Sequence, residues 1–120
     1  MTNQNRGDAA YAEYQRNMRR NQAAIDAAAG KMKNLEKQEE ALRDFKKKFG
    51  RYFEEYRHVY AGTNELNQLN TLKDDMHEQE AKVKKALSDE RTSIKAEQKR
   101  LNAQEEEYRR QYRSHNSRAR

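Results

Sequence analysis

The stretch YAGTN, residues 60–64, decides how this chain of 120 residues is organised. Gly62 suits the left-handed residue that often follows the end of a helix, because glycine has no Cβ to clash there. Thr63 or Asn64 can accept a hydrogen bond from a free N–H of a following helix, and Glu65 would lie in its first turn. No other stretch combines these stop and start signals, so we expect two helices joined at one turn.

Before this turn, apolar residues recur with heptad spacing. With Tyr11 as position a, twelve of the fifteen a and d positions up to Tyr60 are apolar or aromatic, although only 33% of the chain is hydrophobic. We call this row of positions the seam. It predicts a long amphipathic helix over about residues 8–60. Polar residues in a seam can fix register or partner choice. The three polar exceptions are Asn21, Glu39 and Lys46.

After the turn the apolar pattern is thinner. Leu66, Leu87, Ile94, Leu101 and Tyr108 share one seam position, and Leu69, Met76 and Val83 share the other. The second position then becomes polar at Glu90, Glu97 and Gln104. The pattern predicts a second helix over about residues 65–112. Its distal half has one large apolar residue per heptad, which suggests that it needs a partner or frays.

Two long helices joined by one short connection run antiparallel. The predicted fold is therefore all-α, an elongated antiparallel two-helix coiled-coil hairpin that forms one unit over residues 1–112, with its turn at about 61–64. The sequence of residues 113–120 has no apolar period, which predicts a basic flexible tail. The expected pairing places Lys46 beside Glu80, Leu42 beside Val83, Met32 beside Ile94 and Ile25 beside Leu101.

The composition narrows the class of protein. Ile, Leu, Val and Phe number only 14 and 38% of residues are charged, so the chain is either disordered or built from long helices with a narrow apolar stripe. The absence of proline and the presence of only four glycines favour helices. No apolar run is long enough for a transmembrane helix or a secretory signal peptide. The absence of cysteine excludes disulfides and thiolate metal sites.

The sequence offers no motif for catalysis. His58, His77 and His115 share no close motif, and there is no phosphate-binding loop or nucleophile elbow. We therefore predict that the protein is not an enzyme and has no cofactor, metal or small-molecule substrate. The net charge of +6 raises affinity for anions, but acidic residues are interspersed throughout, so the sequence favours a protein partner over nucleic acid.

The region around the turn is the richest in apolar residues. Tyr52, Val59 and Leu72 lie off the strict seam and widen the apolar stripe. One hairpin partner cannot cover so wide a face, so we expect part of it to contact another protein. The alternative is a tip that packs within the hairpin alone. The candidate partner-binding residues are Phe45, Phe49, Tyr52, Phe53, Tyr56, Tyr60, Leu66 and Leu69 at the tip, and Leu87, Ile94 and Leu101 on the thin distal stripe.

The order of the predicted helices and turn resembles that of a known protein family. A long first helix is followed by the aromatic-x-Gly turn at residues 60–62 and by a highly charged second helix. That helix carries Leu66, Asp74-Asp75, the run 87–90, Ile94, Leu101 and Tyr108. This resembles the second class of LXG-associated α-helical proteins, small partners of LXG-domain toxins in type VIIb secretion. It is also similar to WXG-type hairpins, with Tyr60 in place of their tryptophan.

The resemblance implies a non-enzymatic targeting factor or chaperone. Such a protein binds the helical N-terminal LXG domain of a cognate toxin, together with a second small helical protein, for export. It would reside in the cytoplasm, with co-export beside its toxin left open. WXG-type substrates carry an aromatic-x-x-x-acidic export signal, and no Phe or Tyr of this chain is followed four residues later by Asp or Glu. We therefore expect another member of the complex to carry the signal.

Two other functions remain as alternatives. One is a coiled-coil component of a different export apparatus, of the flagellar type. The other is a basic coiled coil that binds nucleic acid, for which affinity must fall steeply as salt is added.

Overall fold

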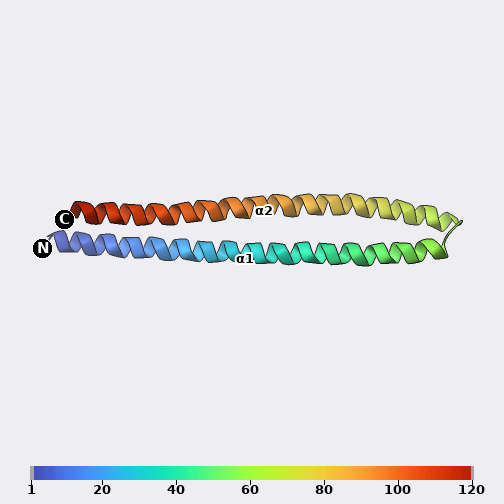
Figure 1. Ribbon diagram of the computed structural model, residues 1–120, viewed down its shortest axis with the longest axis horizontal. Helices are drawn as coiled ribbons and strands as arrows, with labels where there is room; N and C mark the ends of the chain where they lie inside the picture. The colour runs from blue at the N-terminus through green and yellow to red at the C-terminus, as the bar shows by residue number, and fades with distance from the viewer. Residues whose placement is uncertain (1, 120) are drawn as a thin grey trace. The chain divides into compact units, whose positions relative to one another are not determined.

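The computed structural model describes residues 2–119, and side chains for residues 7–117. It contains two helices, α1 (Thr2–Val59) and α2 (Asn64–Ala119), and no strand within the described residues (Figure 1). The predicted all-α, two-helix hairpin fold is confirmed. Helix is the favoured state because no proline interrupts either segment and every backbone N–H can therefore donate.

Both helices extend beyond their expected ends. α1 begins at Thr2 rather than near residue 8, and α2 continues to Ala119 rather than ending near residue 112. The expected end of the second helix near residue 112 is thus wrong, while residue 120 lies outside the description. Local ion pairs stabilise α2 just before this extension. Arg109 lies 2.7 Å from Glu105, and Arg110 lies 2.7 Å from Glu107, at helical spacings that place the side chains next to each other.

The turn lies where the sequence places it. Gly62 has a φ of +79°, and the N–H of Thr63 donates to the carbonyl of Tyr60 at 3.1 Å. A positive φ at the third position of such a turn favours glycine. The hydroxyl of Thr63 also donates to the Tyr60 carbonyl, at 2.7 Å, so its side chain closes the end of α1. The sequence predicts that the side chain of Thr63 or Asn64 caps the start of α2. Here the N–H of Leu66 instead donates to the backbone carbonyl of Thr63.

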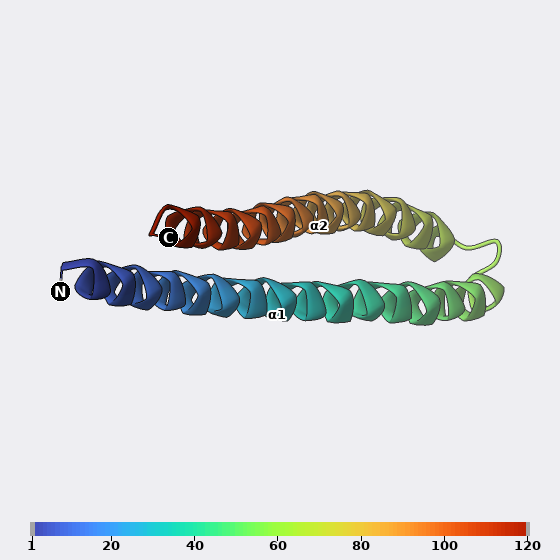
Figure 2. The same cartoon turned by 60° about the vertical axis from the view of Figure 1, so that its left-hand side comes forward.

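The contacts of the chain divide into two compact units. Unit 1 comprises Met1–Met32 and Ser93–Arg120, and unit 2 comprises Lys33–Thr92, which includes the turn. Within each unit, α1 and α2 run antiparallel and side by side, as Figures 1 and 2 show. Each unit therefore has its own apolar contact between the two helices.

The core of unit 1 combines small, aliphatic and polar side chains. Ala28, Ile94 and Leu101 are buried, and so is Asn21, one of the polar exceptions in the seam. The amide Nδ2 of Asn21 donates to the backbone carbonyl of Leu101 at 2.9 Å, which satisfies the buried donor. Because this bond joins the two helices at one point, it can fix their register, as the sequence pattern indicates.

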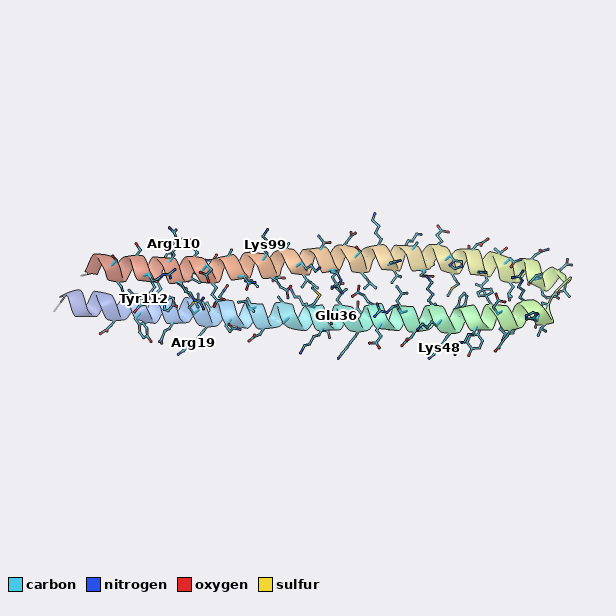
Figure 3. All side chains as sticks on the ribbon, in the orientation of Figure 1. Arg19, Glu36, Lys48, Lys99, Arg110 and Tyr112 are labelled. Atoms are coloured by element: carbon cyan, nitrogen blue, oxygen red, sulfur yellow. The ribbon has the colours of Figure 1, made fainter. Side chains whose placement is uncertain are left out.

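Aromatic rings join the helices of unit 1 near the chain ends. The rings of Tyr14 and Tyr112 stack with centroids 4.5 Å apart, and Tyr11 lies against Tyr112 at 5.9 Å. Figure 3 shows Tyr112 on the side of α2 that faces α1, whereas Arg19 and Arg110 lie on the outer sides of their helices. The seam of unit 1 therefore extends as far as Tyr112.

The core of unit 2 contains the most deeply buried large side chain, that of Leu35, which is 1% exposed. Phe53 is also buried, and the ammonium of Lys73 lies 5.9 Å from its ring centroid. The expected pair of seam charges is confirmed, since Lys46 Nζ lies 3.1 Å from Glu80 Oε1. Opposite charges at facing seam positions thus compensate each other at the edge of the core.

One of the two seam positions of α2 shifts by one residue after residue 80, while Leu87, Ile94 and Leu101 keep the other. Val83, expected in the seam beside Leu42, is 45% exposed, whereas Arg91 is partly covered. Leu42 instead shares a cavity wall with Leu87. An α-helix has 3.6 residues per turn and drifts by about 20° per heptad against a 3.5-residue pattern. The covered position expected at Glu90 therefore falls at Arg91, and the prediction for Val83 is wrong.

Candidate partner-binding surface

A row of aromatic side chains follows α1 towards the turn. The rings of Phe45 and Phe49 stack at 5.6 Å, Phe49 meets Phe53 edge-on at 4.4 Å, and Tyr56 stacks on Tyr60 at 6.1 Å. These contacts join residues four apart, which lie on one face of a helix. The helix thus presents a nearly continuous aromatic surface, only part of which α2 covers.

The uncovered part lies beside the seam. Tyr52 is 57% exposed, Val59 is 71% exposed, and Phe45, Tyr56 and Leu72 are each about half exposed. Scattered exposed apolar residues need no explanation, but five neighbours on one unit form a contiguous patch. We call these five residues the tip face: Phe45, Tyr52, Tyr56, Val59 and Leu72.

A shallow groove of about 310 Å³ lies between the helices of unit 2 and is lined by three residues of the tip face, Tyr52, Tyr56 and Leu72. Its walls are apolar or aromatic, with α1 supplying one side and α2 the other: Phe49, Tyr52, Phe53, Tyr56, Leu69 and Leu72. The lining offers only the hydroxyls of Tyr52 and Tyr56 as side-chain polar groups. Such a surface suits the apolar side of another helix better than a polar small molecule.

The predicted site residues at the tip therefore divide into three groups. Phe45, Tyr52 and Tyr56 are exposed on the tip face, whereas Phe53 is buried in the core. The others are half-buried between the helices: Phe49, Tyr60, Leu66 and Leu69. The off-seam residues Val59 and Leu72 complete the exposed group, and the widening of the apolar stripe in the sequence is the signal that identifies them.

The thin distal stripe does not form a free surface. Ile94 and Leu101 are each 3% exposed within unit 1, and Leu87 is half-buried in unit 2. The expectation that Ile94 and Leu101 face a partner is wrong for the closed helix pair. One large residue per heptad suffices here because small and polar side chains, including Ala28 and Asn21, fill the opposite positions of α1.

An ion pair that the sequence pattern missed crosses unit 2. The Arg91 guanidinium bonds to the carboxylate of Glu39, the second polar exception in the seam. The hydrogen bond from Arg91 holds the pKa of Glu39 below its ordinary value, and the same bond raises the pKa of Arg91. The shift of one seam position in α2 brings Arg91, rather than Glu90, to the edge of the seam.

Acid is expected to weaken this pair. Because the folded pKa of Glu39 is lowered, its contribution is fully present above the ordinary carboxyl pKa of 4.5 and is lost as pH falls through the lowered value. We expect the melting temperature to fall on acidification below about pH 5. Glu39→Gln should show a smaller fall over the same window. Glu40→Gln, at an exposed neighbour, is the control, and identical pH profiles for Glu39→Gln and the parent would contradict the prediction.

Charge is divided unequally between the units. The sequence of unit 2 has thirteen Lys and Arg and thirteen Asp and Glu, whereas unit 1 has thirteen and seven. The entire net charge of +6 therefore belongs to unit 1. The tip face lies on an electrically neutral unit, so neither sign of charge would dominate its encounters.

Membrane-spanning segments and metal sites were two other possibilities for the described residues. Neither helix has a stretch apolar enough to cross a bilayer. No group of three or more His, Asp or Glu side chains in residues 7–117 is arranged to hold a metal ion. The tip face is consequently the strongest candidate for a functional surface.

No family model matches this chain, and no curated protein or solved structure matches it. The resemblance to LXG-associated proteins stays a prediction that rests on the order of sequence features.

Proposed function

We propose that the protein is a non-enzymatic targeting factor or chaperone that binds the helical N-terminal LXG domain of a cognate toxin. A second small helical protein joins the complex, which is then exported by the type VIIb secretion system. The exposure of the tip face carries this proposal. An amphipathic helix of the toxin would place its apolar side on this face and remove both surfaces from water.

The energetics favour a helical ligand. Full burial of a large apolar side chain contributes roughly 1.5–3 kcal/mol, and the residues of the tip face are about half exposed at the outset. Several such contacts can offset the cost of association. The charged residues beside the face would then select among partner helices.

The direct test is co-expression with the products of the neighbouring genes, among which the proposal expects an LXG domain and a second small helical protein. Capture through the LXG domain, followed by mass measurement on a sizing column, should recover a complex that contains all three. Tyr52→Glu should lower recovery about tenfold or more, since it places a charge in the centre of the contact. Arg51→Gln is the matched control, because it makes the same change in charge at an exposed neighbour of Tyr52.

Two results would contradict the proposal. Absence of any complex with the LXG domain would remove the secretion role. Equal recovery with Tyr52→Glu and Arg51→Gln would show that the toxin binds elsewhere than the tip face.

The charge distribution favours nucleic acid as the second candidate partner, through unit 1. Its sequence holds the whole net charge of +6, and Arg16, Arg19, Arg20 and Lys99 are exposed. Binding through phosphates must weaken steeply as salt increases. A titration of duplex DNA and single-stranded RNA at several salt concentrations decides this, and absence of salt-sensitive binding rejects it.

A further inference from the structure

α1 carries a second apolar seam beside the one that contacts α2. Phe45, Phe49, Tyr52, Tyr56 and Val59 follow one another at steps of four, three, four and three residues. This alternation is the spacing by which one helix packs against another in a coiled coil. Phe49 and Tyr56 belong to both seams, so α1 has two adjacent packing faces and only one of them meets α2.

α2 extends the second face. Leu72 is half exposed and lines the groove together with Leu69, three residues earlier. The two helices of unit 2 therefore offer a shared apolar surface of the kind that a helical hairpin buries in a four-helix bundle.

The charges beside this second seam are self-complementary. Lys48 and Glu55 occupy the positions directly before Phe49 and Tyr56, where pairs between helices form in coiled coils. Both side chains belong to exposed residues, and Figure 3 shows Lys48 directed away from α2. If α1 meets an antiparallel copy of itself with Tyr52 at the centre, Lys48 of each copy lies within a turn of Glu55 of the other. Phe45 then lies opposite Val59.

We propose that the occupant of the tip face is a second copy of this chain. Two copies of unit 2 pack face to face, with α1 antiparallel to α1 and Tyr52 at the two-fold axis. Because unit 2 has no net charge, two copies meet without the repulsion that two positive surfaces would experience.

The area of the tip face predicts a weak dimer. Five side chains that are about half exposed can bury on the order of 400–500 Å² on each copy, given that an aromatic side chain buries roughly 150–250 Å² in full. Specific stable interfaces bury about 1,200–2,000 Å² in total, so this contact falls in the class of transient ones. The dimer should therefore form and dissociate as the protein concentration changes.

Self-pairing also bears on the proposed function. If a toxin helix binds the tip face, the second copy and the toxin compete, and dimerisation protects the apolar surface until the toxin is present. Only this competition rests on the proposed function, because the self-pairing follows from unit 2 alone.

Sedimentation equilibrium of the purified full chain, without any toxin, tests the inference. The mean mass should rise from monomer towards dimer as concentration increases. Tyr52→Glu should weaken dimerisation by about tenfold or more, while Arg51→Gln should leave it unchanged. Circular dichroism of both variants checks that they stay helical. A mass that stays monomeric at all concentrations, or equal dimerisation of both variants, would overturn the inference.

A charge swap tests the antiparallel arrangement. Lys48→Glu alone and Glu55→Lys alone should each weaken the dimer, because each places like charges opposite one another. The double variant should recover the dimerisation of the parent, since the pair re-forms with its signs exchanged. A double variant weaker than both single variants would rule out self-pairing of α1 about Tyr52. Mixing with the LXG domain is kept as a separate experiment, so failure of the toxin proposal leaves this result interpretable.

Discussion

Replacing Leu101 with glutamate is expected to unfold the helix pair of unit 1. Leu101 is 3% exposed, so the new carboxylate would be buried without a partner or would force the helices apart. A buried, unpaired charge is among the most destabilising of single changes, and we expect a loss of about 3 kcal/mol or more. Hydrogen exchange followed by mass spectrometry should show faster exchange of the amides in unit 1.

The matched control for this variant is Asn102→Glu. It adds the same charge one residue away, on an exposed side of α2, and should leave exchange and melting close to those of the parent. If Leu101→Glu melted like Asn102→Glu, Leu101 would not be part of the core. The residue would then be free to contact a partner, as the sequence pattern alone suggests.

Much of the fold follows from the sequence because local signals and the heptad pattern agree. The turn is predictable from Gly62, whose left-handed conformation is costly for any residue with a Cβ. The pairing of Lys46 with Glu80 is predictable because both interrupt an otherwise apolar seam at matching distances from the turn. Register near the turn is therefore set by a few residues that are easy to identify.

Register far from the turn is harder to predict, because small differences between the helix period and the sequence period accumulate. By residue 91 one of the two seam positions has moved by one residue, which brings Arg91 to the seam and leaves Val83 exposed, while Ile94 and Leu101 stay in the expected row. A heptad count that continues unchanged from Leu66 cannot show this. Two observations in the sequence could have done so: the polar run after Val83, and a lone Glu39 that needs a cation.

The apolar pattern underestimates the lengths of the helices for a different reason. The apolar period stops at Tyr112, but helix continues to Ala119. Charged side chains three and four residues apart can support a helix on their own surface, without a partner helix. The pairs of Arg109 and Arg110 with the preceding glutamates are of this kind, and they stabilise the turns of α2 from which residues 113–119 continue. An apolar period alone therefore gives the length of the contact between helices rather than the length of the helix.

The candidate site was predictable as a region but not residue by residue. The excess of apolar side chains near the turn indicates a face wider than one partner helix can cover. Which rings turn inwards depends on the exact rotation of α1, and that rotation buries Phe53 while leaving Tyr52 exposed. Adjacent aromatic residues thus differ in role, one holding the hairpin together and the other available for a second contact.

Alanine substitutions at two phenylalanines should separate these roles. Phe53 is 9% exposed and its ring meets Phe49 edge-on, so Phe53→Ala should lower the free energy of unfolding by about 3–5 kcal/mol. Phe45 is 49% exposed, and its ring contacts Phe49 at the edge of the core. Phe45→Ala removes little buried area and should cost about 1 kcal/mol or less. Urea titrations followed by circular dichroism measure both.

Dimerisation should rank the same two variants in the opposite order. Phe45 lies on the tip face, so its loss should weaken the dimer of an otherwise stable chain. Phe53→Ala keeps all five residues of the tip face. Its dimerisation, measured without urea at a temperature where the variant stays helical, should therefore be close to that of the parent. Equal stability of the two variants would contradict the assignment of Phe53 to the core. A dimer that tolerates Phe45→Ala but not Phe53→Ala would place the second packing face on the wrong side of α1.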